Sequence, residues 1–254
     1  MGGIEDEIIM NMEGNMISLE KLTLFYGSRV LLKEIDTTFQ KKSLTALIGR
    51  NGSGKSTLLR AIAGLNPHYK GEITLDGHTL GGIKPAVLAR TIAFVSTART
   101  RIPNMRCEDV VAVGRAPYTN WIGRMQDIDK EIVAKALSAV GMETYAHRTL
   151  DTMSDGECQR IMIARALAQD TPIILLDEPT SFLDMPGRYE LVALLRRLAH
   201  DEGKCILFST HELDVATRMC DAIALIDTPH LIHLPTPAFT AAKHIERLFP
   251  LDMD

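Results

Sequence analysis

Long apolar segments are missing from this chain of 254 residues. The longest apolar runs, such as PIILL and AIALI, fall far short of the roughly 20 residues that a membrane-spanning helix needs, so we expect no such helix. The chain has 28 basic residues and 32 acidic ones. This balance does not indicate the basic surface that binds nucleic acid. The four cysteines lack both metal-ligand and disulfide spacing, and this favours a soluble protein in a reducing, intracellular location.

The first residues also lack the signals of export. MGGIEDEIIMNMEGNM is acidic and does not have the basic-then-apolar order of a secretory signal. We interpret residues 1–16 as an N-terminal tail, with Met12 or Met16 as alternative starts. Apolar residues make up 46% of the chain, enough to bury one full core.

Short strand patterns alternate with helical patterns over most of the chain, which predicts an α/β fold with a mostly parallel sheet. The segments SLEKLTLFYG and GEITLDG alternate like antiparallel strands. Between residues 98 and 150 the pattern becomes helical, with a helix capped by Asp127. The buried strands and the long helix are expected at 43–49, 172–178, 205–211, 222–227 and 187–200.

A glycine-rich loop, GRNGSGKST (49–57), stands between a predicted strand and a predicted helix, the context of a P-loop. Glycines let backbone N–H groups turn toward phosphate oxygens, helped by the positive end of the helix. Lys55 reaches the β- and γ-phosphates, and the Ser56 hydroxyl is a magnesium ligand. An unrelated glycine-rich turn is the alternative. The other positions included in this site are Gly49, Asn51, Gly52, Ser53, Gly54 and Thr57.

Two acids end the strand IILLDEPT, where ligand crevices of open α/β sheets lie. Asp177 would hold magnesium, usually through a water, and Glu178 would polarise the attacking water as general base. His211 follows CILFST at another strand end and could contact the γ-phosphate. The alternative is that these are polar caps on strand ends.

The segment MSDGECQR opens a helix with a capping box, Ser154 with Glu157. Gly156 is a poor residue for a first turn. Either this is a loose loop end, or another group approaches its backbone too closely for a Cβ atom.

Taken in order, these motifs resemble the ATP-binding subunits of ABC transporters, over a span from Tyr26 to His211. MSDGECQR is similar to the signature motif, usually LSGGQ, and SFLD (181–184) is similar to the D-loop, with Asp184 as its acid. The resemblance implies that Tyr26 stacks on adenine and that His211 is the switch histidine. It also implies ATP and Mg²⁺ as cofactors.

The resemblance further implies a homodimer across two ATP sites. Ser154, Gly156 and Glu157 of one subunit would cover the ATP held by the P-loop of the other, which would explain the glycine. The implied fold is a P-loop NTPase (RecA-like) core with an antiparallel β part at the N-terminal side and a small inserted helical subdomain. The expected divisions are 1–16 for the tail, 17–97 for the core with the P-loop, 98–150 for the helical insertion and 151–254 for the rest of the core.

The chain departs from the family pattern at Thr97, which stands where the family has a glutamine that contacts magnesium. Threonine is shorter than glutamine and has no amide, so it would contact the magnesium ion either directly or through a water molecule. The alternative is that this loop mainly serves the membrane partner. VVAVGRAPYTNWIGR (111–124) is similar to the GR-x-P segment of iron–siderophore, haem and vitamin B12 importers. That similarity implies that Arg115, Pro117, Tyr118 and Trp121 lie near a groove for the permease; the alternative is an ordinary loop.

The favoured function is the ATPase of a metal-chelate importer. It would work with integral membrane permease subunits and, indirectly, with a substrate-binding protein. It would lie peripherally on the cytoplasmic face of the cell membrane and bind no nucleic acid. The alternatives are a soluble ABC ATPase that acts on nucleic acid or ribosomes, and a small-molecule kinase with a P-loop.

Overall fold

The computed structural model describes residues 14–98, 102–119 and 125–242. The chain forms two compact units, one of Met1–Ile83 with Arg196–Asp254 and one of Lys84–Leu195. The second unit spans a longer stretch of sequence than the helical insertion expected over 98–150. The limits of that insertion stay a prediction.

An antiparallel sheet with the order β2-β1-β4-β5 forms the N-terminal part of the first unit. Its strands are β1 (Asn15–Tyr26), β2 (Arg29–Gln40), β4 (Tyr69–Leu75) and β5 (His78–Thr79). As predicted, β1 and β4 pair antiparallel. A register shift between Leu19 and Leu22 lets β1 keep both leucines buried although they are an odd number of residues apart.

The remaining strands of the first unit follow the order β10-β9-β3-β8. They are β3 (Ser43–Gly49), β8 (Cys205–Ser209), β9 (Ala222–Asp227) and β10 (His230–Pro235). β3 is parallel to both β8 and β9, and β10 turns back antiparallel to β9. The sequence analysis did not predict β10, which Pro229 precedes and Pro235 ends. The helices here are α2 (Lys55–Ile62), α8 (Leu213–Met219), α9 (Thr236–Ala241) and the 3₁₀ turn Leu80–Gly82.

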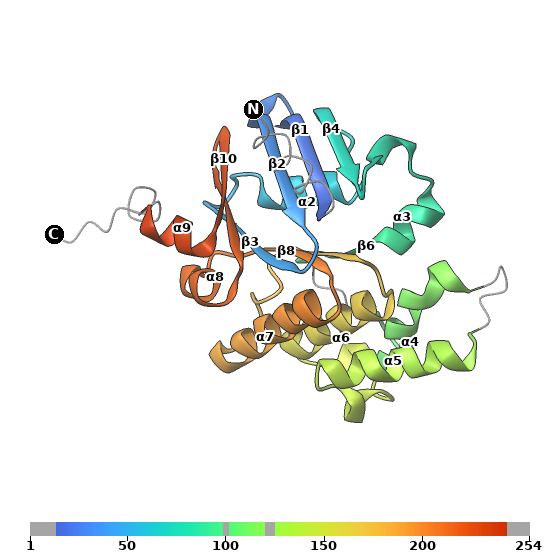
Figure 1. Cartoon of the computed structure of the whole chain (residues 1–254). Helices are drawn as coiled ribbons and strands as arrows, with labels where there is room; N and C mark the ends of the chain where they lie inside the picture. The colour runs from blue at the N-terminus through green and yellow to red at the C-terminus, as the bar shows by residue number, and fades with distance from the viewer. Residues whose placement is uncertain (1–13, 99–101, 120–124, 243–254) are drawn as a thin grey trace. The chain divides into compact units, whose positions relative to one another are not determined.

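The second unit holds a parallel pair of strands, β6 (Ile92–Val95) and β7 (Ile173–Leu176). Its helices are α3 (Pro85–Thr91), α4 (Cys107–Ala112), α5 (Asp127–Ala139) and α6 (Asp155–Ala168), and α7 (Met185–Asp201) begins in it. Its 3₁₀ turns are Val113–Tyr118, Glu143–Tyr145 and Leu150–Thr152. Figure 1 shows α4, α5 and α6 packed on one another.

The described part of 98–150 contains helices and no strand, as predicted. The cap of α5 is Gln126 rather than Asp127. Asp129, at the third helical position, accepts a hydrogen bond from the Gln126 N–H and completes a capping box. The helix cap therefore lies one residue before the position that the sequence predicted. No helix among residues 14–98, 102–119 and 125–242 has the length and apolar character to cross a membrane.

Candidate active site

The phosphate loop leaves β3 at Gly49, the last residue of that strand. A Cβ atom on Gly49 would lie 2.7 Å from Ser53 Oγ and 2.8 Å from the Ile226 carbonyl oxygen, so only glycine fits. Gly54, directly before α2, has a φ of +110°, in the left-handed region that glycine adopts without strain. Two of the predicted loop glycines therefore have a steric reason in this structure.

The start of α2 carries positive potential. No side chain caps the helix and its first turn contains no acidic residue, so neither a cap nor an acid of that turn offsets the helix dipole. Lys55 adds a formal charge there and is 5% exposed. Its Nζ donates to the carbonyl oxygens of Gly49 at 2.8 Å and Arg50 at 3.3 Å, which keeps the ammonium inside the loop. An anion is the ligand this arrangement favours.

One hydroxyl of the loop lacks a partner. Ser53 Oγ is buried and makes no hydrogen bond to any described residue. A buried polar group left in this state costs about 1–3 kcal/mol. A phosphate oxygen would accept a hydrogen bond from this hydroxyl, so the orphaned group supports the predicted phosphate site.

A cavity of about 260 Å³ adjoins the loop, lined by Arg29, residues 49–53 and Leu225–Thr228. Tyr26 ends β1 and is not among the lining residues, but its side chain is 73% exposed. A ring this accessible is able to stack on a base. Its contact with adenine stays a prediction.

Asp177 directly follows β7, whose four residues are all buried. The carboxylate itself has an exposed fraction of 0%. Thr97 Oγ1 donates to Asp177 Oδ2 at 3.2 Å, so the predicted metal residues Thr97 and Asp177 lie together. Carboxylate and hydroxyl oxygens are hard ligands, the type that Mg²⁺ prefers.

Glu178 stands in the left-handed region, with a φ of +48°, which is uncommon for a residue other than glycine. Strained backbone of this kind concentrates at functional sites. Ser181 Oγ donates to Glu178 Oε2 at 3.1 Å, and the Ser181 N–H donates to the Glu178 carbonyl oxygen at 3.2 Å. Ser181 was missed from the sequence, although its place in SFLD, three residues after the acid, was a usable signal.

His211 lies in the first unit, just beyond β8, and is exposed. The preceding residue, Thr210, donates its N–H to the Leu47 carbonyl oxygen of β3 at 3.1 Å. The histidine therefore follows a strand that pairs with the strand leading into the phosphate loop. Its contact with a γ-phosphate stays a prediction.

The capping box of α6 is confirmed. Ser154 Oγ accepts from the Glu157 N–H at 3.3 Å and donates to Glu157 Oε2 at 2.7 Å, and the Ser154 N–H donates to the same oxygen at 2.8 Å. These hydrogen bonds, first the hydroxyl's and then the N–H's, hold the pKa of Glu157 below its ordinary value. In this state the Ser154 hydroxyl serves its own helix.

Gly156 does have a close neighbour, and it belongs to the same chain. A Cβ atom at Gly156 would lie 3.0 Å from the Phe182 carbonyl oxygen and 3.5 Å from Leu183 Cδ2. The backbone of the SFLD segment, at Phe182, therefore makes the close approach that the sequence predicted. Asp184, the acid of that segment, accepts the Gly187 N–H on Oδ1 at 3.1 Å at the start of α7.

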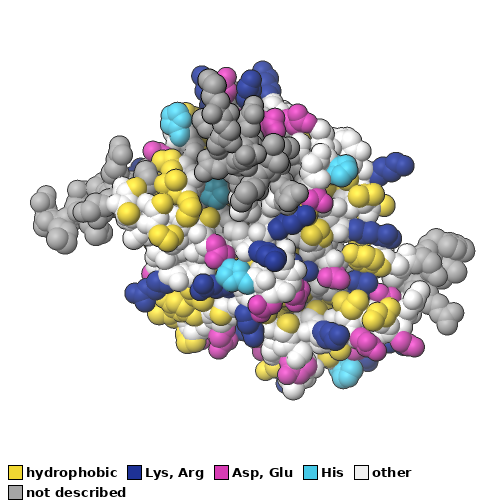
Figure 2. All heavy atoms as spheres, in the orientation of Figure 1, with side chains coloured by type: hydrophobic (Ala, Val, Ile, Leu, Met, Phe, Trp, Pro, Cys, Tyr) yellow, Lys and Arg dark blue, Asp and Glu magenta, His cyan; other side chains and the backbone are white. Residues whose placement is uncertain are grey.

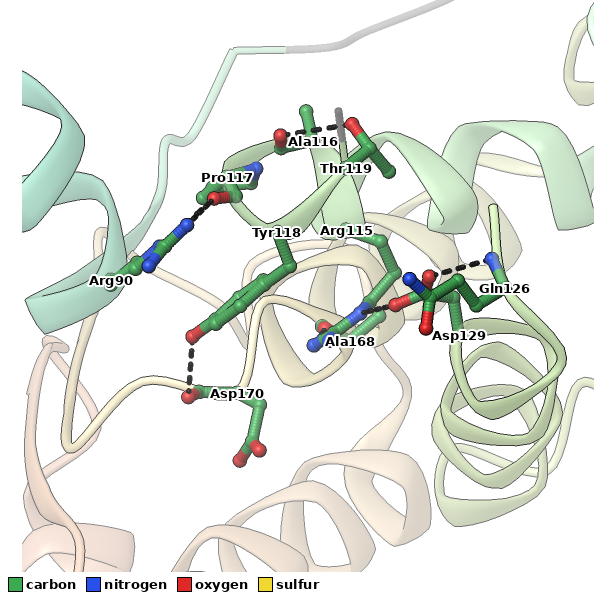
Figure 3. A network of polar contacts seen from close by, with 10 residues as sticks. All are labelled: Arg90, Arg115, Ala116, Pro117, Tyr118, Thr119, Gln126, Asp129, Ala168 and Asp170. Carbon is green, nitrogen blue, oxygen red and sulfur yellow. Dashed lines mark hydrogen bonds and ion pairs between the residues drawn. The ribbon is translucent and has the colours of Figure 1, made fainter. Parts of the chain in front are cut away.

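Arg115 is buried and holds several elements together (Figure 3), and its nearness to a permease groove stays a prediction. Its side chain is 7% exposed, and its Nε donates to Asp129 Oδ1 at 2.9 Å. Its Nη1 donates to the Ala168 carbonyl oxygen at the end of α6, also at 2.9 Å. The Gln126 N–H and then the guanidinium keep the pKa of Asp129 below its usual range. This contact joins 113–118, α5 and α6.

The same network anchors the residues that follow. The Arg115 guanidinium lies 4.1 Å from the centroid of the Tyr118 ring, and Tyr118 Oη donates to the Asp170 carbonyl oxygen at 3.2 Å. Arg90 donates from Nη2 and Nε to the Pro117 carbonyl oxygen at 2.6 and 2.9 Å. Figure 3 shows these groups converging from α3, the 113–118 turn and α6. Trp121 lies outside the described residues.

The sequence profile of the ABC transporter family matches residues 32–181. The chain belongs to this family. An ABC transporter ATP-binding protein of Methanocaldococcus jannaschii is 42% identical over 91% of the chain and 79% of the relative. An achromobactin transport ATP-binding protein of Dickeya dadantii is 37% identical over 83% and 78%.

Solved structures agree with this assignment. A transporter described as metal-chelate type, in an inward-facing conformation, superposes with a TM-score of 0.81 at 26% identity, over 93% of this chain and 89% of the other. A dimeric ATP-binding cassette bound to ADP and phosphate gives 0.77 at 26% identity, over 87% and 99%. The predicted P-loop NTPase fold is confirmed, and this ABC cassette binds ATP and is an ATPase.

Proposed function

We propose that this ABC cassette hydrolyses ATP to drive uptake of a metal chelate, such as a siderophore, haem or cobalamin, through a separate membrane permease. Three observations support nucleotide binding: the uncapped start of α2, the buried Lys55 ammonium and the orphaned Ser53 hydroxyl. The cargo rests on relatives named for siderophore transport, including the achromobactin protein and a ferric enterobactin transport ATP-binding protein of Escherichia coli at 34% identity.

In this proposal the phosphate loop binds the triphosphate. Backbone N–H groups of residues 49–57 and the Lys55 ammonium neutralise its charge, and the Ser53 hydroxyl donates a hydrogen bond to it. Glu178, oriented by Ser181, accepts a proton from the attacking water. His211 contacts the γ-phosphate, and Tyr26 stacks on the base.

Magnesium fits the oxygen-rich residues present. The described residues contain no group of three or more His, Cys, Asp or Glu side chains able to hold a metal by themselves. Mg²⁺ in phosphoryl-transfer sites typically takes one or two protein oxygens plus substrate phosphates, and Ser56 and Asp177 each offer an oxygen of this kind. When bound, the ion would offset charge on the phosphate oxygens.

Two subunits would close head to tail, so that Ser154 and Gly156 of each cover the nucleotide of the other. A solved structure similar to this chain is a dimer with ADP and phosphate, which supports dimerisation. The cassette would then work at the cytoplasmic face of the membrane with permease subunits and, through them, a substrate-binding protein. No observation favours nucleic acid: on the face drawn in Figure 2, basic and acidic side chains of the described residues are interspersed.

The decisive experiment is recovery of the tagged chain from its native membrane in mild detergent, followed by mass spectrometry. We expect a polytopic permease and a substrate-binding protein. Uptake of labelled siderophore, haem and cobalamin is then compared in cells with the wild-type chain and with Glu178→Gln. Recovery of ribosomal proteins or nucleic acid, with no effect of Glu178→Gln on any uptake, would overturn the importer proposal and leave the ATPase in place.

A further inference from the structure

Parallel pairing brings Thr97 beside Asp177. In the register of β6 with β7, Val95 lies opposite Leu176. The Asp177 N–H donates to the Val95 carbonyl oxygen at 2.8 Å, so the pairing continues beyond the end of β7. Two residues after Val95, Thr97 places its hydroxyl 3.2 Å from Asp177 Oδ2 and donates a hydrogen bond to it.

The burial of Asp177 makes this hydrogen bond important. The residue has no exposed surface, whereas Thr97 is half-buried. The terminal torsion of an aspartate is broad and sets no single carboxylate orientation by itself. A donor fixed to one oxygen selects one orientation, and away from water the charge-assisted bond is strong.

The length of the threonine side chain matters as well. Its hydroxyl is attached to Cβ, whereas the amide of a glutamine at this position would lie two carbons further from the backbone. The short threonine side chain contacts the acid directly.

We propose that Thr97 is a positioning residue, whose hydroxyl orients the Asp177 carboxylate for the magnesium ion of bound ATP. This inference rests on the proposed role of Asp177 in holding that ion. It replaces the expectation that Thr97 is itself a metal ligand. Residues that orient a metal ligand typically change metal affinity 10- to 100-fold when they are removed.

The first measurement uses metal-free protein in EDTA. Thr97→Val removes the hydroxyl at nearly constant shape, and Thr97→Ser keeps it. Loss of a hydrogen bond to a charged group should lower Tm by about 3–12 °C, and the serine variant should stay near wild type. The control is Thr91→Val in α3, where the lost hydroxyl donates only to the Val87 carbonyl oxygen of its own helix.

The second measurement is the affinity for Mn²⁺ in the presence of ATP, by electron paramagnetic resonance at a temperature far below Tm. All variants carry Glu178→Gln to prevent turnover. We expect Thr97→Val to weaken Mn²⁺ binding about 10-fold or more, and Thr97→Ser and Thr91→Val to leave it unchanged. If the valine variant is insoluble, Thr97→Ala gives the same comparison.

The two measurements separate the possible roles. A fall in both Tm and Mn²⁺ affinity for valine, rescued by serine, supports positioning. Unchanged Tm with weakened Mn²⁺ binding would make Thr97 a direct ligand, and lowered Tm with unchanged Mn²⁺ binding would make its role purely structural; either overturns the inference. If the parent Glu178→Gln protein binds no Mn²⁺ with ATP, the metal role of Asp177 fails, and the inference about Thr97 fails with it.

Discussion

The helix starts of α2 and α6 use their first turns in opposite ways. α2 begins at a left-handed glycine, has no side-chain cap, contains no early acid and places a buried lysine at its first position. α6 begins with a serine cap, closes a capping box and carries Asp155 and Glu157 in its first turn. The α2 start is prepared for an anion by itself, whereas the α6 start is already satisfied by its own side chains.

This difference teaches that the two motifs have unequal tasks before nucleotide arrives. The phosphate loop gains from any phosphate that enters, since the ligand supplies an acceptor for the Ser53 hydroxyl. At α6, a phosphate has to compete with Glu157 for the Ser154 hydroxyl and approach two acids. We therefore expect α6 to contribute only when a second subunit presents ATP already held by its own phosphate loop.

The largest effect, on ATP turnover, is expected from Glu178→Gln. Because this variant should still bind ATP, it also allows the contributions of the α2 and α6 starts to be compared. The glutamine keeps the shape but cannot accept a proton, so steady-state ATP turnover should fall about 10²- to 10⁴-fold. Nucleotide binding should persist and the protein should be trapped as a dimer. Glu131→Gln, on the exposed surface of α5, is the control. Turnover at the wild-type rate would remove Glu178 from the role of base.

The next effect isolates α2. Lys55→Ala removes the buried ammonium, and the affinity of the monomer for ATP should fall about 10- to 100-fold, the loss expected for a charged hydrogen bond. Titration with a fluorescent ATP analogue measures it. Lys33→Ala, at an exposed position of β2, should bind like wild type. Equal affinity for the Lys55 variant would show that backbone groups alone hold the phosphates.

A change at the start of α6 should affect dimerisation and leave nucleotide binding by the monomer intact. Ser154→Arg in the Glu178→Gln background should leave monomer binding intact but weaken ATP-driven dimerisation about 10-fold or more, because the bulky side chain fills the covering surface. Size-exclusion chromatography with and without ATP measures it. Ser138→Arg, exposed on α5, is matched in residue type. A dimer that still forms normally contradicts the role assigned to the α6 start.

A smaller effect is expected at Gly156. In an open helix a change from glycine to alanine stabilises by about 1 kcal/mol. Here the new methyl group would lie 3.0 Å from the Phe182 carbonyl oxygen, and overpacking costs about 1–3 kcal/mol. We expect Gly156→Ala to lower the free energy of unfolding by about 1 kcal/mol in urea titration without nucleotide. Gly82→Ala, with no atom within 4 Å of its Cβ position, is the control. A stabilised Gly156→Ala protein would show that the SFLD backbone moves aside.

The smallest effect concerns pH. Folding lowers the pKa of Glu157 below its ordinary value of 4.5, mainly through the hydrogen bond from the Ser154 hydroxyl. The stabilisation from this carboxylate is therefore fully present above pH 4.5 and is lost as the pH falls through the folded-state pKa. Urea titrations from pH 7 to pH 3 should show wild type and Glu157→Gln converging at the acid end. Ser154→Ala should reduce the difference at neutral pH, and parallel curves would contradict the capping role of the charge.

Several elements were predictable because their causes are local. The strands at 43–49 and 222–227 occur as expected, since continuous apolar runs bounded by turns suit buried parallel strands. The capping box of α6 needs only a serine and a glutamate three residues apart. The strand β10 was missed, because prolines that border a strand and prolines that interrupt one look alike in sequence.

The sequence by itself determined the phosphate loop, the acids after β7 and the cap of α6, since each depends on residue types within a few positions. Tertiary structure alone decided that Phe182 is the close neighbour of Gly156, that Arg115 is buried against Ala168, and that Thr97 donates to Asp177. The Thr97 and Arg115 partners are 80 and 53 residues away. Contacts over such separations are set by strand register and helix packing, and no spacing in the sequence encodes them directly.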